Sequence, residues 1–319
     1  MKQIFLLVFI LSIFTQSYGQ QSLNIEDGFV RTEDDFNLYY HKVGTGSEVV
    51  IVPAGMYLAD EFKRLKNNKR TIIFYDPRGR GHSDGINDKE KLGIEYEISD
   101  LESIRNHFKQ EKISLIGWSY LGAVVALYTI KYPQHVNRAI QIGPIPPRKD
   151  PYWEQFIKTN SSRLDNNDKK TIEDIYERYQ NSDNTKEFIK QYYKIAHKTL
   201  FYGEVVEDKF REDFYTLENE KPNNVWNFVL PNIIQSLGDW DFRSNLSKVE
   251  VPFLTIHGGY DAIPIESAKE WSKYFPQGKI LIINDAGHLP WLEKQESFYK
   301  AVDIFLSGNW PARAIKINN

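Results

Sequence analysis

Short apolar runs alternate with amphipathic segments along most of this 319-residue chain, and this alternation limits its fold more than any other feature. The apolar runs are rich in β-branched residues, which suits strands that are buried on both faces. Helical patterns connect them; Ile98, Leu101 and Ile104, for example, share one helical face. Strands that alternate with helices predict an α/β fold with a mostly parallel central sheet flanked by helices. The expected strands are 28–31, 37–42, 48–52, 70–75, 113–117, 136–142, 252–257 and 279–283.

The alternation is interrupted between residues 146 and 245. Apolar residues keep helical spacing there, as Ile172, Ile175 and Tyr179 do, but no strand-like run occurs. We expect this insertion to form a helical cap over one edge of the sheet. The predicted domains are therefore a core made of residues 20–145 and 246–319 and a cap made of residues 146–245.

The first 19 residues have the order of a secretory signal peptide. Lys2 precedes an apolar run from Ile4 to Phe14, and the small residues Ser17 and Gly19 follow. This run is too short for a membrane span, which needs roughly 20 apolar residues. We expect cleavage after Gly19 or after Gln20. The mature protein is then expected to be secreted or periplasmic, without a membrane span.

Composition excludes several kinds of chemistry. The chain has no cysteine, which excludes disulfides, thiolate nucleophiles and cysteine-based metal sites. Its formal net charge of -3 gives no basic field for a nucleic acid. The histidines do not have the spacing of metal ligands, so no metal or other cofactor is implied. A small molecule or a short peptide is the expected partner.

Ser119 lies where a predicted strand runs into a predicted helix. A nucleophile at such a turn sits on a sharp elbow and projects its hydroxyl above the carboxyl edge of the sheet. The elbow crowds its neighbours, so glycine is expected two residues before the serine and two residues after it. Gly117 meets the first requirement, whereas Leu121 occupies the second position and Gly122 comes one residue later. The alternative is a serine that only caps the helix.

A serine nucleophile needs a base, and the base needs an acid that orients it. His288 follows the last predicted strand, and Asp261 follows a glycine turn after the preceding strand. Both positions fall at the carboxyl edge of the sheet, where ligand chemistry collects in open α/β sheets. The order serine, acid, histidine also fits an elbow nucleophile. We therefore predict Ser119, Asp261 and His288 as catalytic residues. An ordinary turn aspartate and a surface histidine are the alternatives.

Acyl transfer also requires N–H donors for the oxyanion of the tetrahedral intermediate. The backbone N–H of Tyr120, at the start of the helix, is one expected donor. Gly55 or Met56, after the strand 48–52, is expected to supply the second, since Pro53 has no N–H. Trp118 and Tyr120 flank the nucleophile and are the expected residues of the substrate pocket.

These segments resemble the α/β-hydrolase superfamily across nearly the whole mature chain. Residues 76–84, Asp-Pro-Arg-Gly-Arg-Gly-His-Ser-Asp, resemble its Asp-x-Arg-Gly-x-Gly-x-Ser segment, and residues 287–293 resemble its catalytic histidine segment. The resemblance is to the capped branch that includes proline iminopeptidases and related esterases. It implies the α/β-hydrolase fold with an inserted helical cap and a Ser-Asp-His triad at the three positions named above. Pro53-Ala54-Gly55 replaces the usual His-Gly of the oxyanion loop.

The predicted function is hydrolysis of a small ester or amide by acyl transfer to water. The chain would then be a carboxylesterase or an aminopeptidase similar to proline iminopeptidase. An aminopeptidase needs carboxylates in the cap that bind a substrate ammonium group. A catalytically inactive ligand-binding protein with the same fold is the other alternative, which Leu121 favours. The cap carboxylates considered are Glu154, Glu173, Asp174, Glu204 and Glu207.

Overall fold

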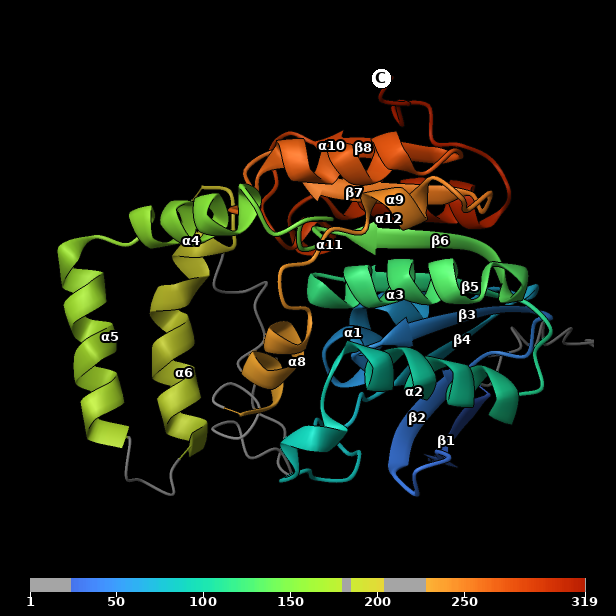
Figure 1. The fold of residues 1–319 in the computed structure, drawn as a ribbon, viewed down its shortest axis with the longest axis horizontal. Coiled ribbons are helices and arrows are strands. Elements are labelled where there is room, and N and C mark those ends of the chain that lie inside the picture. Colours follow the sequence, from blue (N-terminus) through green and yellow to red (C-terminus); the bar gives the residue numbers. More distant parts are fainter. Residues whose placement is uncertain (1–23, 180–184, 204–227, 319) are drawn as a thin grey trace, which may run out of the picture.

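A computed structural model describes residues 24–179, 185–203 and 228–318 of the chain (Figure 1). The predicted signal peptide, residues 1–19, lies outside the described residues, so its cleavage and the export of the protein stay predictions. Within the described ranges, none of the helices has both the length and the apolar character that a membrane crossing requires.

One eight-stranded sheet forms the centre of the molecule, in the order β1-β2-β4-β3-β5-β6-β7-β8. β1 pairs with β2 and β2 with β4 in antiparallel fashion, and all other pairs are parallel. The eight strands predicted from the sequence are confirmed, with ends that differ by at most three residues. Their bounds are β1 Ile25–Arg31, β2 Asn37–Val43, β3 Glu48–Pro53, β4 Arg70–Tyr75, β5 Ile113–Trp118, β6 Val136–Ile142, β7 Phe253–Gly258 and β8 Gly278–Ile283.

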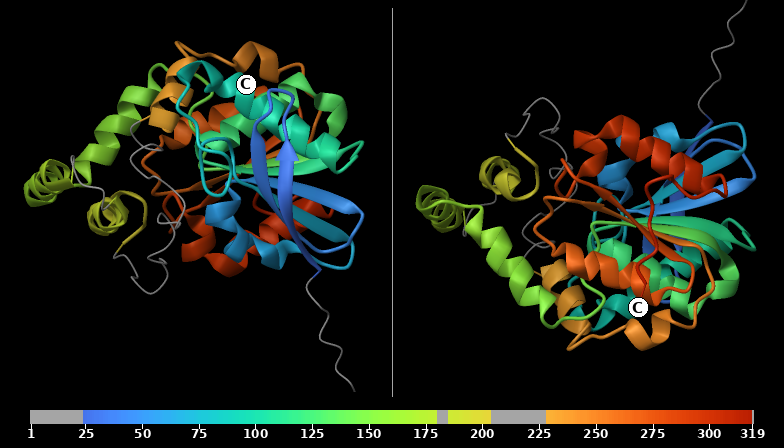
Figure 2. Two further views of the ribbon diagram at one scale, coloured as in Figure 1. Left: turned by 90° about the horizontal axis from the view of Figure 1, so that it is seen from below. Right: turned by 90° about the horizontal axis from the view of Figure 1, so that it is seen from above.

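Helices cover both faces of this sheet (Figure 2). Successive side chains of a strand point to opposite faces, and in β4 the pair Ile72 and Phe74 joins one core while Ile73 and Tyr75 join the other. Because both faces of the central strands are buried, β4, β5 and β7 are largely apolar, whereas the edge strand β1 is mostly exposed. The first core includes α1 (Gly55–Phe62) and α12 (Gln295–Leu306); the second includes α2 (Ile94–His107), α3 (Tyr120–Lys131) and α10 (Ile265–Tyr274).

Four further helices lie beyond the carboxyl ends of the parallel strands (Figure 1). α5 and α6 are antiparallel neighbours, and Ile175 of α5 and Phe188 of α6 are buried. The predicted boundaries of the cap, residues 146–245, stay a prediction. These helices are α4 (Tyr152–Ser162), α5 (Asn166–Tyr179), α6 (Thr185–Ala196) and α8 (Leu230–Ser236). The remaining short elements are η1 (Lys63–Leu65), η2 (Lys89–Lys91), η3 (Pro133–His135), η4 (His197–Thr199) and α9 (Arg243–Leu246).

The apolar spacing of Leu292, Phe298 and Val302 predicts one helix from Trp291 to Leu306, and this prediction is wrong. The chain forms α11 (Pro290–Glu293) and then α12, with Lys294 between them in a non-helical conformation (φ -130°, ψ 54°). Trp291 and Phe298 are both buried against Phe62. Because apolar residues on both sides of the break face the same core, the helical periodicity continues across it and conceals it.

Arg78 fixes the loop that follows β4. Its Nε and Nη2 donate to the two carboxylate oxygens of Asp100 on α2 at 2.7 and 2.5 Å, and both side chains are 1% exposed. Nη1 and Nη2 also donate to Asp34 at 3.1 and 3.2 Å. A fork of this kind joins the β1–β2 turn, the β4 loop and α2 through bidentate charge-assisted hydrogen bonds. Through Arg78, the segment 76–84 therefore connects three parts of the fold.

Replacement of Arg78 by methionine is expected to lower the free energy of unfolding by about 3–5 kcal/mol, because it leaves Asp100 buried and without its cation. Urea denaturation followed by circular dichroism measures this change. Arg243→Met is the control, since the ion pair between Arg243 and Asp241 is partly exposed and contributes at most about 1 kcal/mol. Equal losses in the two variants would contradict a special role for the buried pair.

Candidate active site

Ser119 occupies a strained turn between β5 and α3. Its φ of 57° and ψ of -130° lie in a region that residues other than glycine rarely adopt. A Cβ on Gly117 would approach the backbone oxygen of Leu121 to 2.3 Å, so only glycine fits two residues before the serine. The chain therefore forms the sharp elbow that presents a serine hydroxyl at the carboxyl edge of a sheet.

Leu121 does not prevent this elbow. Its side chain is buried with Ala54 and Val124, at the side of the elbow that faces β3 and α1. The close approach to β6 is made by Gly122, where an added Cβ would lie 3.1 Å from the Cβ of Gln141. Because Gly122 sits at the tight contact, a leucine at the preceding position fits without opening the elbow.

His288 and Asp261 form a buried pair beside this elbow. The Nδ1 of His288 lies 2.7 Å from Oδ2 of Asp261, whose side chain is 1% exposed, and Oδ1 accepts the backbone N–H of Ile263 at 3.0 Å. Burial raises the pKa of Asp261, but the adjacent His288 outweighs it, so that the net pKa lies below the ordinary value. An ionised Asp261 can only accept, so Nδ1 carries the proton and Nε2 is left as the basic nitrogen.

Two hydrogen bonds to the backbone of His288 hold the loop that carries it. The indole Nε1 of Trp118 donates to the carbonyl of His288 at 3.1 Å. The N–H of His288 donates to the carbonyl of Leu200, which follows η4, at 2.6 Å. A Cβ on Gly287 would come within 2.1 Å of that same carbonyl, so glycine is required for this approach. The segment after η4 thus contacts the histidine loop directly.

Glu293 strengthens the same contact. One of its carboxylate oxygens accepts the backbone N–H of Gly287, and the other accepts that of Tyr202, each at 2.6 Å. Burial raises the pKa of Glu293, although both N–H donors oppose this effect. Glu293 belongs to the segment that resembles the catalytic histidine segment, but its role cannot be predicted from the sequence. Its partner Tyr202 lies 91 residues away, and nothing local indicates the contact.

Gly143, directly after β6, leaves room for the His288–Asp261 pair. It has a φ of +48°, and its N–H donates to the carbonyl of Ile256 at 2.9 Å. A Cβ at this position would lie 2.8 Å from Oδ2 of Asp261 and 2.9 Å from Nδ1 of His288. Sequence reasoning missed this residue, since a glycine before a proline indicates a turn and nothing more.

The expected oxyanion donors lie at two helix N-termini. Tyr120 begins α3, and Gly55 and Met56 begin α1. The first N–H groups of a helix have no acceptor within the helix and attract negative charge. Ala54, which precedes Gly55, adopts the left-handed conformation with a φ of 70°, and it borders the same cavity as Ser119.

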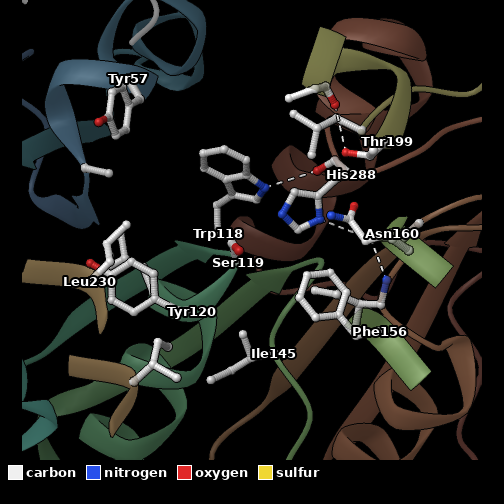
Figure 3. A pocket seen from close by; sticks show the side chains of 18 of the residues that line it. Tyr57, Trp118, Ser119, Tyr120, Ile145, Phe156, Asn160, Thr199, Leu230 and His288 are labelled. Atoms are coloured by element: carbon white, nitrogen blue, oxygen red, sulfur yellow. Dashed lines mark hydrogen bonds and ion pairs between the residues drawn. The ribbon is translucent and has the colours of Figure 1, made fainter. Parts of the chain in front are cut away.

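A cavity of about 490 Å³ joins these residues. Ser119, His288 and Asp261 all line it, as do both predicted pocket residues, Trp118 and Tyr120 (Figure 3). Its volume falls within the range of small-molecule sites. Most of the remaining wall is aromatic or aliphatic and comes from α1, α4, α6 and α8. The aromatic side chains are Tyr57, Trp153, Phe156, Tyr192 and Tyr193.

Carboxylates are scarce in this wall. Among the described residues that line the cavity, Asp261 is the one acid, and it is bound to His288. The cap residues Glu154, Glu173 and Asp174 are exposed and do not line the cavity. The other two predicted cap carboxylates, Glu204 and Glu207, lie outside the described residues. Within the described ranges, no three acidic or histidine side chains gather in a way that would hold a metal ion.

Known proteins resemble this chain in sequence. The sequence matches the family described as alpha/beta hydrolase fold over residues 52–295. It is 26% identical over 311 residues to a protein named proline iminopeptidase from Saccharolobus solfataricus, covering 92% of this chain and 96% of that protein. It is also 23% identical to the proline iminopeptidase of Thermoplasma volcanium, covering 89% and 97% of the two chains.

Solved structures share the fold. An esterase from Exiguobacterium antarcticum superimposes with a TM-score of 0.68 at 18% identity, covering 89% of this chain and all of the esterase. The proline iminopeptidase of Mycobacterium smegmatis superimposes with a TM-score of 0.66 at 17% identity, covering 88% and 98% of the two chains. At these low sequence identities, the similarity shows that the fold is shared.

Gly143→Ala is expected to slow labelling of Ser119 by a fluorophosphonate about a hundredfold or more, since the new methyl group separates His288 from Asp261 and small displacements of this kind have effects of that size. Mass spectrometry of the labelled peptide over time measures the rate. Gly85→Ala is the control, because a Cβ there has open space around it. An unchanged rate in the Gly143 variant would show that the pair tolerates the methyl group.

Glu293→Gln is expected to slow the same labelling about 10- to 100-fold. Glutamine retains one acceptor oxygen and turns its NH₂ toward a backbone N–H, and a buried unsatisfied donor costs about 1–3 kcal/mol. Glu296→Gln, on the exposed first turn of α12, should label like the native protein. A native labelling rate in the Glu293 variant would mean that the loop is held by other contacts.

Proposed function

The chain belongs to the α/β-hydrolase fold family, and on that premise we propose that it is a serine hydrolase that cleaves small carboxylic esters through Ser119, His288 and Asp261. The observation that carries the proposal is the buried pair of His288 and ionised Asp261, which shares one cavity with a serine on a strained elbow. A serine that only capped a helix would not need this conformation. The same elbow argues against an inactive binding protein.

The mechanism follows from the roles of these groups. Ser119 attacks the ester carbonyl while Nε2 of His288 takes its proton, and Asp261 holds the imidazole and stabilises its charged form. Backbone N–H groups of Tyr120 and of Gly55 or Met56 stabilise the oxyanion. His288 then protonates the departing alkoxide, leaving an acyl group on Ser119. A water molecule, activated by His288, releases the acid and restores the serine.

An ester substrate is favoured by the character of the cavity wall. A substrate with a free amino terminus brings an ammonium group, which needs an acidic partner when it is desolvated. The described wall offers no carboxylate besides Asp261. The relatives named proline iminopeptidase nevertheless support an aminopeptidase as a second candidate. Comparison of p-nitrophenyl butyrate with proline p-nitroanilide separates the two, since hydrolysis of the anilide alone would identify a peptidase.

Ser119→Ala is expected to lower kcat/KM for p-nitrophenyl butyrate by about 10⁴-fold or more, because no other group replaces the nucleophile. Peptide mapping after fluorophosphonate treatment should find the adduct on Ser119 in the native protein. His288→Ala should abolish the adduct, whereas Ser161→Ala, at an exposed position of α4, should retain both adduct and activity. Near-native hydrolysis by the Ser119 variant would refute the mechanism.

A further inference from the structure

Arg80 brings a positive charge to the wall of the cavity. It belongs to the loop after β4 and lines the cavity with Ser119 and Tyr120. Among the described wall residues it is the one lysine or arginine. Its side chain is 3% exposed, so water screens its charge poorly. An isolated cation in a largely apolar wall costs free energy unless an anion accompanies it.

The guanidinium group is held in place by contacts with Tyr120, Glu97 and Arg78. It lies over the ring of Tyr120, the residue after Ser119, with 5.3 Å between its central carbon and the ring centroid. Nη2 donates to Oε1 of Glu97 on α2, and Nε makes a long contact of 3.4 Å with the carbonyl of Arg78. None of the hydrogen bonds within the described part of the chain engages Nη1. Since Arg80 lines the cavity, Nη1 is the donor that we assign to a ligand there.

Glu97 is a weak counter-ion for this arginine. It is fully buried, and burial raises its pKa to about 7, although Arg80 and Arg78 oppose the rise and Asp100 adds to it. Its second oxygen, Oε2, has no hydrogen-bond partner among the described residues. Burial thus weakens the negative charge with which Glu97 compensates Arg80.

The position of Arg80 identifies the part of the substrate that it faces. In the close view of the cavity, Tyr120 and His288 lie on opposite sides of Ser119 (Figure 3). His288 protonates the leaving alcohol in the proposed mechanism, so the alcohol lies on its side of the serine. With the alcohol at His288, the side with Tyr120 is left for the acyl chain, and Arg80 lies over the ring of Tyr120.

We propose that Arg80 forms an anion subsite in the acyl part of the cavity, and that the enzyme prefers monoesters of short dicarboxylic acids. The free carboxylate of such a substrate binds the guanidinium while the ester carbonyl reaches Ser119. This inference rests on the proposed function for its chemistry, but binding to Arg80 does not require hydrolysis. The competing role for Arg80 is a purely structural ion pair with Glu97.

Monoethyl glutarate and ethyl pentanoate form a matched pair of substrates, because they share the chain length and the leaving group and differ in a terminal carboxylate or methyl group. The native protein should show a kcat/KM about 10-fold or more higher for monoethyl glutarate, as expected of a charge-assisted hydrogen bond. Acid release at constant pH measures both rates. The ratio of the two values, rather than either rate, is the readout, because general damage to the protein cancels in it.

Two variants move this ratio in opposite directions. Glu97→Gln retains an acceptor for Nη2 but removes the counter-charge, so the ratio should rise severalfold. The double variant Arg80→Met with Glu97→Gln removes both charges together, avoids an unpaired buried ion, and should lower the ratio about tenfold or more. The control is Arg105→Met with Glu102→Gln, an Arg–Glu pair within α2 that does not line the cavity, and it should leave the ratio unchanged.

Calorimetric titration of Ser119→Ala with glutarate supplies a second readout that needs no turnover. If this variant binds glutarate and loses the binding when Arg80→Met and Glu97→Gln are introduced into it, the subsite is supported. This holds even if neither ester is hydrolysed and the proposed function fails. Hydrolysis of both esters with a ratio near one in the native protein, or a ratio that the Arg80 variant leaves unchanged, would overturn the anion subsite and leave the serine hydrolase intact.

Discussion

The hydrogen bond between His288 and Asp261 is the interaction on which the site depends, and the fold is arranged to allow it. A carboxylate that is 1% exposed is costly unless it is paired. The pair forms because β7 and β8 are parallel neighbours, so the loops that follow them emerge at the same edge. Gly143 directly follows the next strand, β6, and leaves the space that the two side chains occupy. The segments that follow these strands thus supply both the partner for the charge of Asp261 and the space for the pair.

Much of this arrangement could be predicted from the sequence, since it depends on local pattern. β3 to β8 are largely apolar, and β1 and β2 flank a polar turn, so all eight strands could be predicted. The loops that follow three of these strands contain the candidates Ser119, Asp261 and His288. Gly143 could not be recognised, because the atoms that exclude a side chain there come from loops more than a hundred residues away. The break at Lys294 was missed because helical periodicity continues across it.

Leu121 illustrates a different limit of sequence reasoning. Spacing along the chain marks a position where glycine is expected, but it does not show which side of the helix meets the sheet. In the structure that contact belongs to Gly122, next to Gln141, and Leu121 turns toward Ala54. The departure from the motif therefore changes the shape of the cavity beside the oxyanion donors, not the conformation of the nucleophile.

The hydrogen bond from the N–H of His288 to the carbonyl of Leu200 has a consequence for dynamics. Any motion that carries the segment after η4 away from the sheet breaks this bond and releases the backbone of the base. The position of Leu200, which lines the cavity, is therefore coupled to the alignment of the base, and a ligand that contacts Leu200 favours the aligned state. Hydrogen exchange at this single amide would report how often the cavity opens.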